Sequence, residues 1–310
     1  NTLMVKPMNK ETTFAPIILF VYNRPEHTRR TVTSLLKNPQ AEMSDLFVFS
    51  DAAKDKSVEE TVRQVREYIR QISGFKTVTI YERDSNWGLA NSVIDGVTRI
   101  CNEFGKVVVL EDDLQVSPHF LAYMNTGLDK YEHDEQVMQI AGYMFPVDIQ
   151  SNEDALFLPL TSSWGWATWQ NSWEKFDKTA SSFNTIKNNP DLKKQFNLDG
   201  RYPYFKMLEA QKKAKVDSWA IRWYLSVFIK NGLVLYPRKS LVENSGFDGS
   251  GVNCVVSGFD DTPIDATFEV KTFPANSVTS PFFDELIKKL PKPKFSIKAF
   301  LSRLIKPFKV

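Results

Sequence analysis

The sequence has few of the residues that form metal clusters, disulfide frameworks and histidine-based catalytic sites. It contains two cysteines, Cys101 and Cys254, and three histidines in 310 residues. The two cysteines show neither metal-type spacing nor a disulfide framework, and a reducing compartment fits this pattern, although the two could also form one bridge. No apolar run approaches the roughly 20 residues that a membrane span needs. A P-loop, a nucleophile elbow and a dinucleotide-binding glycine fingerprint are also missing, which excludes several common enzyme classes.

Positive charge is concentrated near the C-terminal end. Residues 288–310 hold eight of the 39 Lys and Arg residues and no Asp or Glu, which leaves 31 basic against 37 acidic residues elsewhere. Proteins that bind nucleic acid need a basic face for phosphate contacts. The mildly acidic body therefore argues against a nucleic-acid-binding protein.

The basic tail at residues 294–310 has the pattern of an amphipathic helix. Its apolar residues share one helical face: Ile297, Phe300, Leu301, Leu304, Ile305 and Phe308. A basic amphipathic helix of this kind can lie in the interface of an anionic membrane. The alternative is a helix that docks on the body of the protein itself.

Strand-like and helix-like segments alternate through the first half. Strands are expected at residues 16–22, 45–51, 76–83 and 106–113, and helices at residues 24–38, 57–72 and 91–105. This alternation predicts an α/β fold with a mostly parallel sheet flanked by helices. The second half is less regular, with an aromatic cluster at 162–173, an amphipathic segment at 217–232 and a strand at 233–237. Residues 276–294 contain three prolines and look like a linker.

Three consecutive acids, Glu111, Asp112 and Asp113, follow the apolar strand that begins at residue 106. Adjacent carboxylates at the end of a buried strand repel one another, and a divalent cation would relieve that repulsion. Oxygen ligands suit Mg²⁺ or Mn²⁺, which complete their coordination shell with water and substrate phosphates. The alternative is a solvated strand end or a cap on the helix that follows.

Polar residues also follow the other expected strands, and ligands bind at the carboxyl ends of such sheets. Arg24 could pair with a phosphate or ribose, or it could be an ordinary surface arginine. Asp51 could accept hydrogen bonds from a nucleobase, or it could form an Asx-turn. Asn86 lies in a turn before a helix that could bring backbone N–H groups to a diphosphate.

Two features of the second half could serve an acceptor. Trp164, Trp166 and Trp169 could stack on the apolar faces of sugars, although tryptophans more often pack in a core. Asp217 could act as the general base that takes a proton from an attacking hydroxyl. It could instead belong to the N-terminal cap of the helix that follows it.

These residues together resemble GT-A glycosyltransferases of the N-acetylglucosaminyltransferase I type, and more broadly bacterial enzymes that build surface polysaccharides. The resemblance runs from about residue 16 to residue 253, and its most specific stretch is VVVLEDDLQVSPHFLAYM at residues 107–124. It implies a GT-A (Rossmann-like) fold that transfers a sugar from a nucleotide-sugar, such as UDP-GlcNAc, with inversion. It also implies a donor-binding half at residues 1–160, an acceptor-binding half at 161–275, and a linker and tail at 276–310.

The same resemblance assigns roles to individual residues. Asp113 would be the ligand of Mn²⁺ or Mg²⁺, and Asp217 the catalytic base. The other expected contacts to the donor are Arg24, Asp51, Asn86, Glu111, Asp112 and Ser250. Trp164, Trp166 and Trp169 would line the acceptor side, where a glycan or a lipid-linked oligosaccharide would bind.

Two other functions are open to such a sheet. A nucleotidyltransferase would make nucleotide-sugars, but it would need a glycine-rich phosphate loop after the first strand, and residues 23–30 contain no glycine. A non-catalytic glycan-binding protein would need neither metal nor nucleotide. The expected location is the cytoplasmic face of a bacterial plasma membrane, where the tail would hold the protein peripherally.

Overall fold

The computed structural model describes residues 14–149, 151–246 and 263–290. The four strands predicted in the first half are present and run parallel to one another in the order β3-β2-β1-β4. Their bounds are β1 (Ile17–Val21), β2 (Asp45–Ser50), β3 (Thr77–Glu82) and β4 (Lys106–Glu111). β1 and β4 are central and buried on both faces, which is why their sequences show no polar alternation.

Strands from the second half extend the same sheet on the far side of β4. They are β6 (Val137–Ala141), β7 (Ala155–Leu158), β8 (Trp166–Trp169) and β9 (Leu233–Pro237), and the full order is β3-β2-β1-β4-β8-β6-β9-β7. β8 pairs antiparallel with β4 and β6, β7 pairs antiparallel with β9, and β6 pairs parallel with β9. The sheet is therefore parallel in its first half and mixed in its second.

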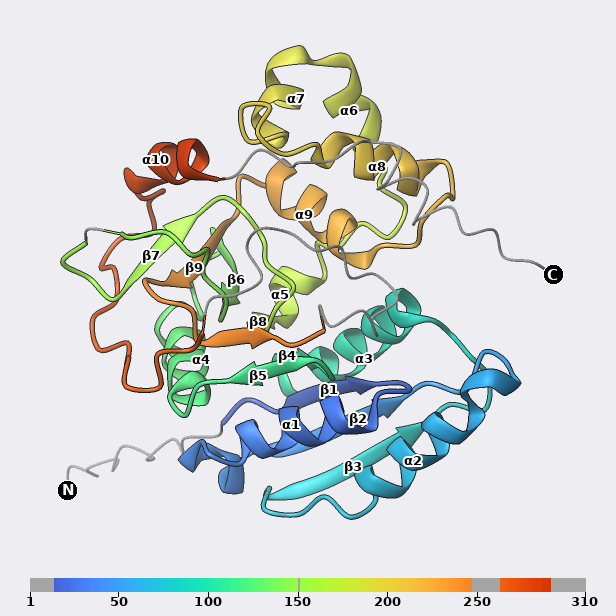
Figure 1. The fold of residues 1–310 in the computed structure, drawn as a ribbon. Coiled ribbons are helices and arrows are strands. Elements are labelled where there is room, and N and C mark those ends of the chain that lie inside the picture. The colour runs from blue at the N-terminus through green and yellow to red at the C-terminus, as the bar shows by residue number, and fades with distance from the viewer. Residues whose placement is uncertain (1–13, 150, 247–262, 291–310) are drawn as a thin grey trace, which may run out of the picture.

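Helices cover both faces of this sheet (Figure 1). On one face, α1 (Pro25–Leu35), α2 (Glu59–Ile69) and α4 (Phe120–Lys130) pack against the odd residues of β1, such as Leu19. On the other face, α3 (Leu89–Phe104), α5 (Gln170–Trp173) and α9 (Trp219–Ile229) pack with its even residues, such as Phe20. The remaining elements are η1 (Pro39–Met43), η2 (Lys56–Val58), α6 (Phe183–Asn188), α7 (Pro190–Phe196), α8 (Tyr204–Lys212) and α10 (Phe282–Lys289).

A separate two-stranded ribbon lies beside the end of β4. β5 (Leu114–Val116) directly follows the acidic triplet and pairs antiparallel with β10 (Val242–Asn244). This pairing brings residues 242–246 next to a segment about 130 positions earlier in the chain. The ribbon thus adds residues of the second half to the end of a first-half strand.

Residues 276–290 are not the linker that the prolines suggested. Pro281 is the N-cap of α10, a position where a proline starts a helix instead of interrupting it. Leu286 and Ile287 of α10 are buried in the core that α9 also joins. The preceding segment is held by Asp154, whose carboxylate accepts the backbone N–H groups of Lys271 and Thr272, each at 3.0 Å.

Within the part of the chain that the structure describes, no helix has the length and apolar character needed to cross a bilayer.

Candidate functional site

The candidate site lies where the parallel strands end. Phe20 in β1 is in register with Glu111 in β4, and Val21 is in register with Ser50 in β2. The residues that follow these three strands therefore meet at one edge of the sheet. Arg24, Asp51 and the acidic triplet were all predicted from the sequence to lie at this edge.

Arg24 forms ion pairs with two of the three acids. Its Nη2 atom lies 2.9 Å from Asp113 Oδ2 and also donates to Asp112 Oδ1. The exposed fractions of the three side chains are only 16% for Arg24, 5% for Asp112 and 9% for Asp113. The Nη1 atom of Arg24 is buried and has no hydrogen-bond partner within the described residues. A single cationic side chain therefore pairs with both aspartates, and its Nη1 still has donor capacity left over.

The backbone around Asp112 is fixed by elements that flank the site. Thr31 of α1 donates its hydroxyl to the Asp112 carbonyl at 2.8 Å, and the Tyr22 N–H contacts Asp112 Oδ2 at 3.3 Å. The Tyr22 hydroxyl accepts the Lys54 N–H at 3.2 Å, in the loop that follows β2. Tyr22 thus ties the end of β2 to the acidic triplet.

Burial, and to a lesser extent the neighbouring carboxylates, raise the pKa values of two acids. Burial, with Asp113 and Asp112 nearby, raises the pKa of Glu111 to about 8. Burial also raises the pKa of Asp112 to about 6, although Arg24 acts in the opposite direction. Both carboxyl groups therefore hold a proton more tightly in the folded state than in water, chiefly because they are buried.

The turn after β10 completes this cluster; from the loop that begins here, the resemblance named only Ser250 as a donor contact. Ser245 donates its N–H to the Asp113 carbonyl at 2.9 Å, and the His27 imidazole lies 3.2 Å from the Ser245 carbonyl. A Cβ atom added to Gly246 would lie 2.3 Å from Asp113 Oδ2 and 3.0 Å from Asn244 Oδ1. Only glycine leaves room for these two oxygens here. Nothing local in the sequence indicated that residues 244–246 would reach Asp113.

These oxygens fit a hard divalent cation whose coordination is shared with a ligand. Among the described residues, no group of three His, Cys, Asp or Glu side chains could hold a metal alone. Asp113 supplies one carboxylate and Asn244 a neutral oxygen beside it. Mg²⁺ and Mn²⁺ commonly use one or two protein carboxylates together with phosphate oxygens and water. The donor set therefore suits a cation that arrives with a phosphorylated ligand.

Asp51 has mainly a structural role in this geometry. Its carboxylate accepts three backbone N–H groups, from Ala52 at 2.9 Å and from Trp87 and Gly88 at 2.8 Å each. Asn86 lies alongside, where its Nδ2 donates to the Ala52 carbonyl at 2.7 Å. The carboxylate thus joins the end of β2 to the start of α3. These contacts are not those of an Asx-turn, in which the side chain bonds the backbone two residues on, and recognition of a base by Asp51 stays a prediction.

Asp217 lies two residues before the start of α9. The next residue, Ser218, is the N-cap and accepts the Ile221 N–H at 3.4 Å, so Asp217 is not needed as a cap. Its side chain is 54% exposed, and one carboxylate oxygen lies 2.6 Å from Arg222 Nη2. Trp219 of α9 stacks on Trp166, which is paired with β4 two residues before Glu111. The Asp217 carboxylate is therefore accessible and is oriented by Arg222.

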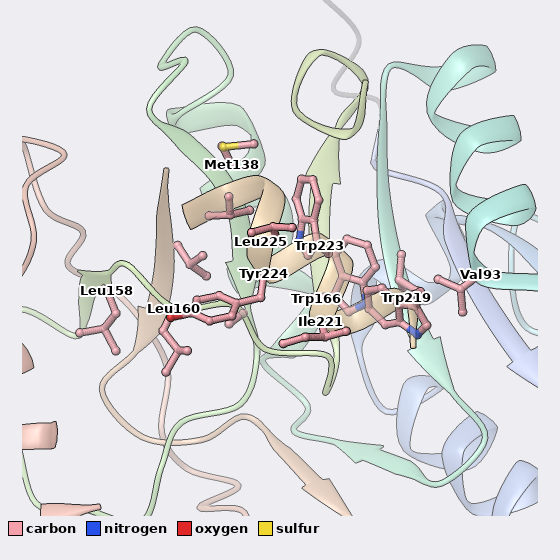
Figure 2. Packing of buried hydrophobic residues seen from close by; sticks show 14 of the residues in the cluster. Val93, Met138, Leu158, Leu160, Trp166, Trp219, Ile221, Trp223, Tyr224 and Leu225 are labelled. Carbon is pink, nitrogen blue, oxygen red and sulfur yellow. The ribbon is translucent and has the colours of Figure 1, made fainter. Parts of the chain in front are cut away.

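Two of the three predicted acceptor tryptophans belong to the core instead. Trp166 is 1% exposed and contacts Trp173, Trp219 and Trp223, with ring centroids 5.1 to 6.4 Å apart. Figure 2 shows Trp166, Trp219 and Trp223 within this apolar cluster. Trp169 is 4% exposed on the opposite face of the sheet, because side chains alternate along a strand and the two residues are three positions apart in β8. This burial contradicts an acceptor-facing role for both rings.

Trp164 differs from these two rings. It is partly buried and packs edge-to-face on Tyr143, with ring centroids 4.5 Å apart. It precedes β8 and so lies near the same edge of the sheet as the end of β4. Ser250 and the basic tail at 294–310 lie outside the described residues.

Comparisons with known proteins agree with this geometry. Residues 2–145, just under half of the chain, match the model of the GNT-I family, and this range includes Arg24 and the acidic triplet. No curated protein gives a significant match.

Among solved structures, the apo form of mouse xyloside xylosyltransferase 1 matches with 10% identity and a TM-score of 0.36, over 69% of this chain and 80% of that one. The mannosyltransferase PcManGT from Pyrobaculum calidifontis, in complex with GDP-Man and Mn²⁺, matches with 12% identity and a TM-score of 0.34, over 71% and 75%. Similarities this weak carry no conclusion about substrate or metal. The family match and the arrangement of the sheet support a GT-A-type glycosyltransferase that resembles the GNT-I family.

Proposed function

We propose that this protein is a metal-dependent, inverting glycosyltransferase that uses a UDP-sugar, such as UDP-GlcNAc. The acceptor would be a hydroxyl of a glycan or lipid-linked oligosaccharide in bacterial surface polysaccharide synthesis. The observation that carries this proposal is the cluster at the end of β4. There, two buried aspartates, Arg24 and the turn at 244–246 meet, and the Asp113 and Asn244 side-chain oxygens both lie beside Gly246.

On the donor side, the residues have separable tasks. Asp113, with Asn244 beside it, would hold Mn²⁺ or Mg²⁺. Such a cation, when bound, neutralises charge on a diphosphate leaving group. Arg24 would turn the unused donor capacity of its guanidinium toward the phosphates. Asp112 and Glu111 would face the ribose and the sugar.

On the acceptor side, Asp217 would be the general base. A direct displacement forms a bond from the acceptor oxygen to the anomeric carbon while the bond from that carbon to the diphosphate breaks. The hydroxyl proton passes to the carboxylate that lies opposite the leaving group. Arg222 supports this task because it is 6% exposed and holds the Asp217 carboxylate at 2.6 Å. Trp164 is the remaining aromatic candidate for contact with the acceptor.

Two variants test the assignment of donor and acceptor tasks. Asp113→Ala should lose Mn²⁺-dependent binding of UDP, measured by calorimetry. Asp217→Asn should bind UDP with Mn²⁺ as the wild type does and yet fail to transfer sugar. Asp129→Asn is the matched control, because Asp129 is 51% exposed and also ion-paired, to Lys106 at 2.7 Å. It should leave both measurements unchanged.

The products separate this proposal from other functions. Sugar transfer releases UDP, whereas a nucleotidyltransferase releases pyrophosphate, and a glycan-binding protein releases neither. Normal transfer by Asp217→Asn would refute the base, and Mn²⁺-dependent UDP binding by Asp113→Ala would refute the metal ligand.

The proposed location is the inner face of a bacterial plasma membrane. The supporting feature is the basic, amphipathic sequence of residues 294–310. Deletion of these residues should abolish sedimentation with anionic vesicles and leave transfer to a soluble acceptor unchanged. Equal sedimentation of the truncated and full chains would refute this location.

A further inference from the structure

Trp87 is the one exposed tryptophan of this protein. All seven tryptophans lie within the described residues, and the side chain of Trp87 is 41% exposed. Five of the others are at most 4% exposed, and Trp164 is partly buried. An exposed indole leaves a large apolar area in contact with water, and exposed apolar groups beside a site often contact its ligand.

The indole of Trp87 rests on a fixed cation. The Arg83 guanidinium lies 3.8 Å from the centroid of the ring. Arg83 is itself 12% exposed, forms an ion pair with Asp95 and lies 5.5 Å from the Phe49 ring. Because the guanidinium covers one face of the indole, the exposed area belongs to the opposite face and the edges.

The backbone of Trp87 is held just as firmly. Its N–H donates to Asp51 Oδ1 at 2.8 Å, and its carbonyl accepts the Asn91 side-chain amide at 2.9 Å. These contacts place Trp87 beside the end of β2, at the edge where β1 and β4 also end. The loop that follows β2 is tied to the acidic triplet by Tyr22.

Asn86 supplies a hydrogen-bonding group next to this ring. Its Nδ2 donates to the Ala52 carbonyl, and its Oδ1 accepts no hydrogen bond within the described part of the chain. Asp51, in contrast, already accepts three backbone N–H groups. Beside Trp87, the Asn86 amide oxygen is therefore an acceptor left free by the described residues, whereas the Asp51 carboxylate is largely occupied.

We propose that Trp87 is the stacking platform for the nucleobase of the donor, and that Asn86 Oδ1 accepts the imide N–H of uracil. This inference rests on the proposed function, which it deepens by assigning the base subsite. A flat indole of fixed orientation stacks on a base with little loss of entropy, and the cation beneath it anchors the ring. Phosphate binding at Arg24 and Asp113 is a separate task of the same edge.

The test compares two ligands in the full-length protein. UDP with Mn²⁺ contains the base, whereas inorganic pyrophosphate with Mn²⁺ contains only the phosphates. Trp87→Leu should weaken UDP binding by about 5- to 140-fold, the range for loss of one base–aromatic stack, and should leave pyrophosphate binding unchanged. Trp87→Phe, which keeps an aromatic ring, should recover most of the UDP affinity.

A matched control uses the exposed aromatic residue at the other end of α3. Phe104 is 38% exposed, and Phe104→Leu should change neither affinity. Binding of UDP by Trp87→Leu at wild-type affinity would overturn the base subsite and leave the proposed function standing. An equal loss of UDP and pyrophosphate would also overturn it, because the residue would then act through the structure of the whole edge. If the wild type bound neither ligand with Mn²⁺, the proposed function would fall together with this inference.

Discussion

Removal of Arg24 should reveal how strongly the buried acids depend on a cation. Arg24→Met keeps the apolar stem of the side chain and deletes the guanidinium that pairs with Asp112 and Asp113. Both aspartates are less than a tenth exposed, so neither can be solvated fully in place of the lost pair. Breaking a buried ion pair by removal of one partner typically costs about 3–5 kcal/mol, because an uncompensated buried charge remains.

The measurement is the free energy of unfolding from urea denaturation, compared with a variant that breaks an exposed pair. Arg70 is 56% exposed and lies 2.7 Å from Glu82, so Arg70→Met should cost only about 0–1 kcal/mol. Adding Asp112→Asn to Arg24→Met should recover part of the lost stability, since it removes one of the two unpaired charges. Mn²⁺ should raise the stability of Arg24→Met more than that of the wild type, because a bound cation replaces the missing charge.

A loss for Arg24→Met no larger than that for Arg70→Met would refute this reasoning. It would mean that the carboxylates at the end of β4 do not need Arg24 for charge balance. A double variant less stable than Arg24→Met alone would refute it in a second way, since the aspartate would then contribute more than its charge.

Three further outcomes follow from the packing and the pKa values. Trp166→Ala should destabilise the fold by about 3–5 kcal/mol in urea denaturation, as expected for a core tryptophan. Trp164→Ala should destabilise it less, because Trp164 is only partly buried, and should raise the KM for the acceptor. Burial raises the pKa of the Cys101 thiol to about 12. In a Cys254→Ser variant, Cys101 should therefore not react with a disulfide reagent at pH 8 until the protein unfolds, and fast reaction of the native protein would contradict this. Hydrogen bonds from the Lys271 and Thr272 amides help to lower the pKa of Asp154 below its unfolded value of 3.8. The ionised carboxylate therefore stabilises the fold fully above pH 3.8, and this stabilisation is lost as the pH falls through the lower folded pKa. Hydrogen exchange of the two amides should become faster in that pH range, and Asp154→Asn should not show this pH dependence.

The sequence alone determined the local structure of the first half. Apolar runs bounded by polar residues predicted all four parallel strands, and Gly105 predicted the end of α3, where it adopts a positive φ of 77°. The acidic triplet was visible because three charges in a row at the end of a buried strand have no local structural reason. These signals are local in the chain, so they can be read without knowing the fold.

Tertiary contacts decided how these residues are used. Arg24 reaches Asp112 across 88 positions, and Asp51 reaches the Trp87 and Gly88 amides across 36 and 37 positions. The pairing of β5 with β10 alone brings Asn244 and Gly246 to Asp113. Likewise, a cluster of tryptophans in the sequence is compatible with a core or with a sugar-binding wall. The packing of α5 and α9 on β8 decides between these for Trp166 and buries it. Such contacts depend on which elements become neighbours in space, and hydrophobic periodicity carries no information about that.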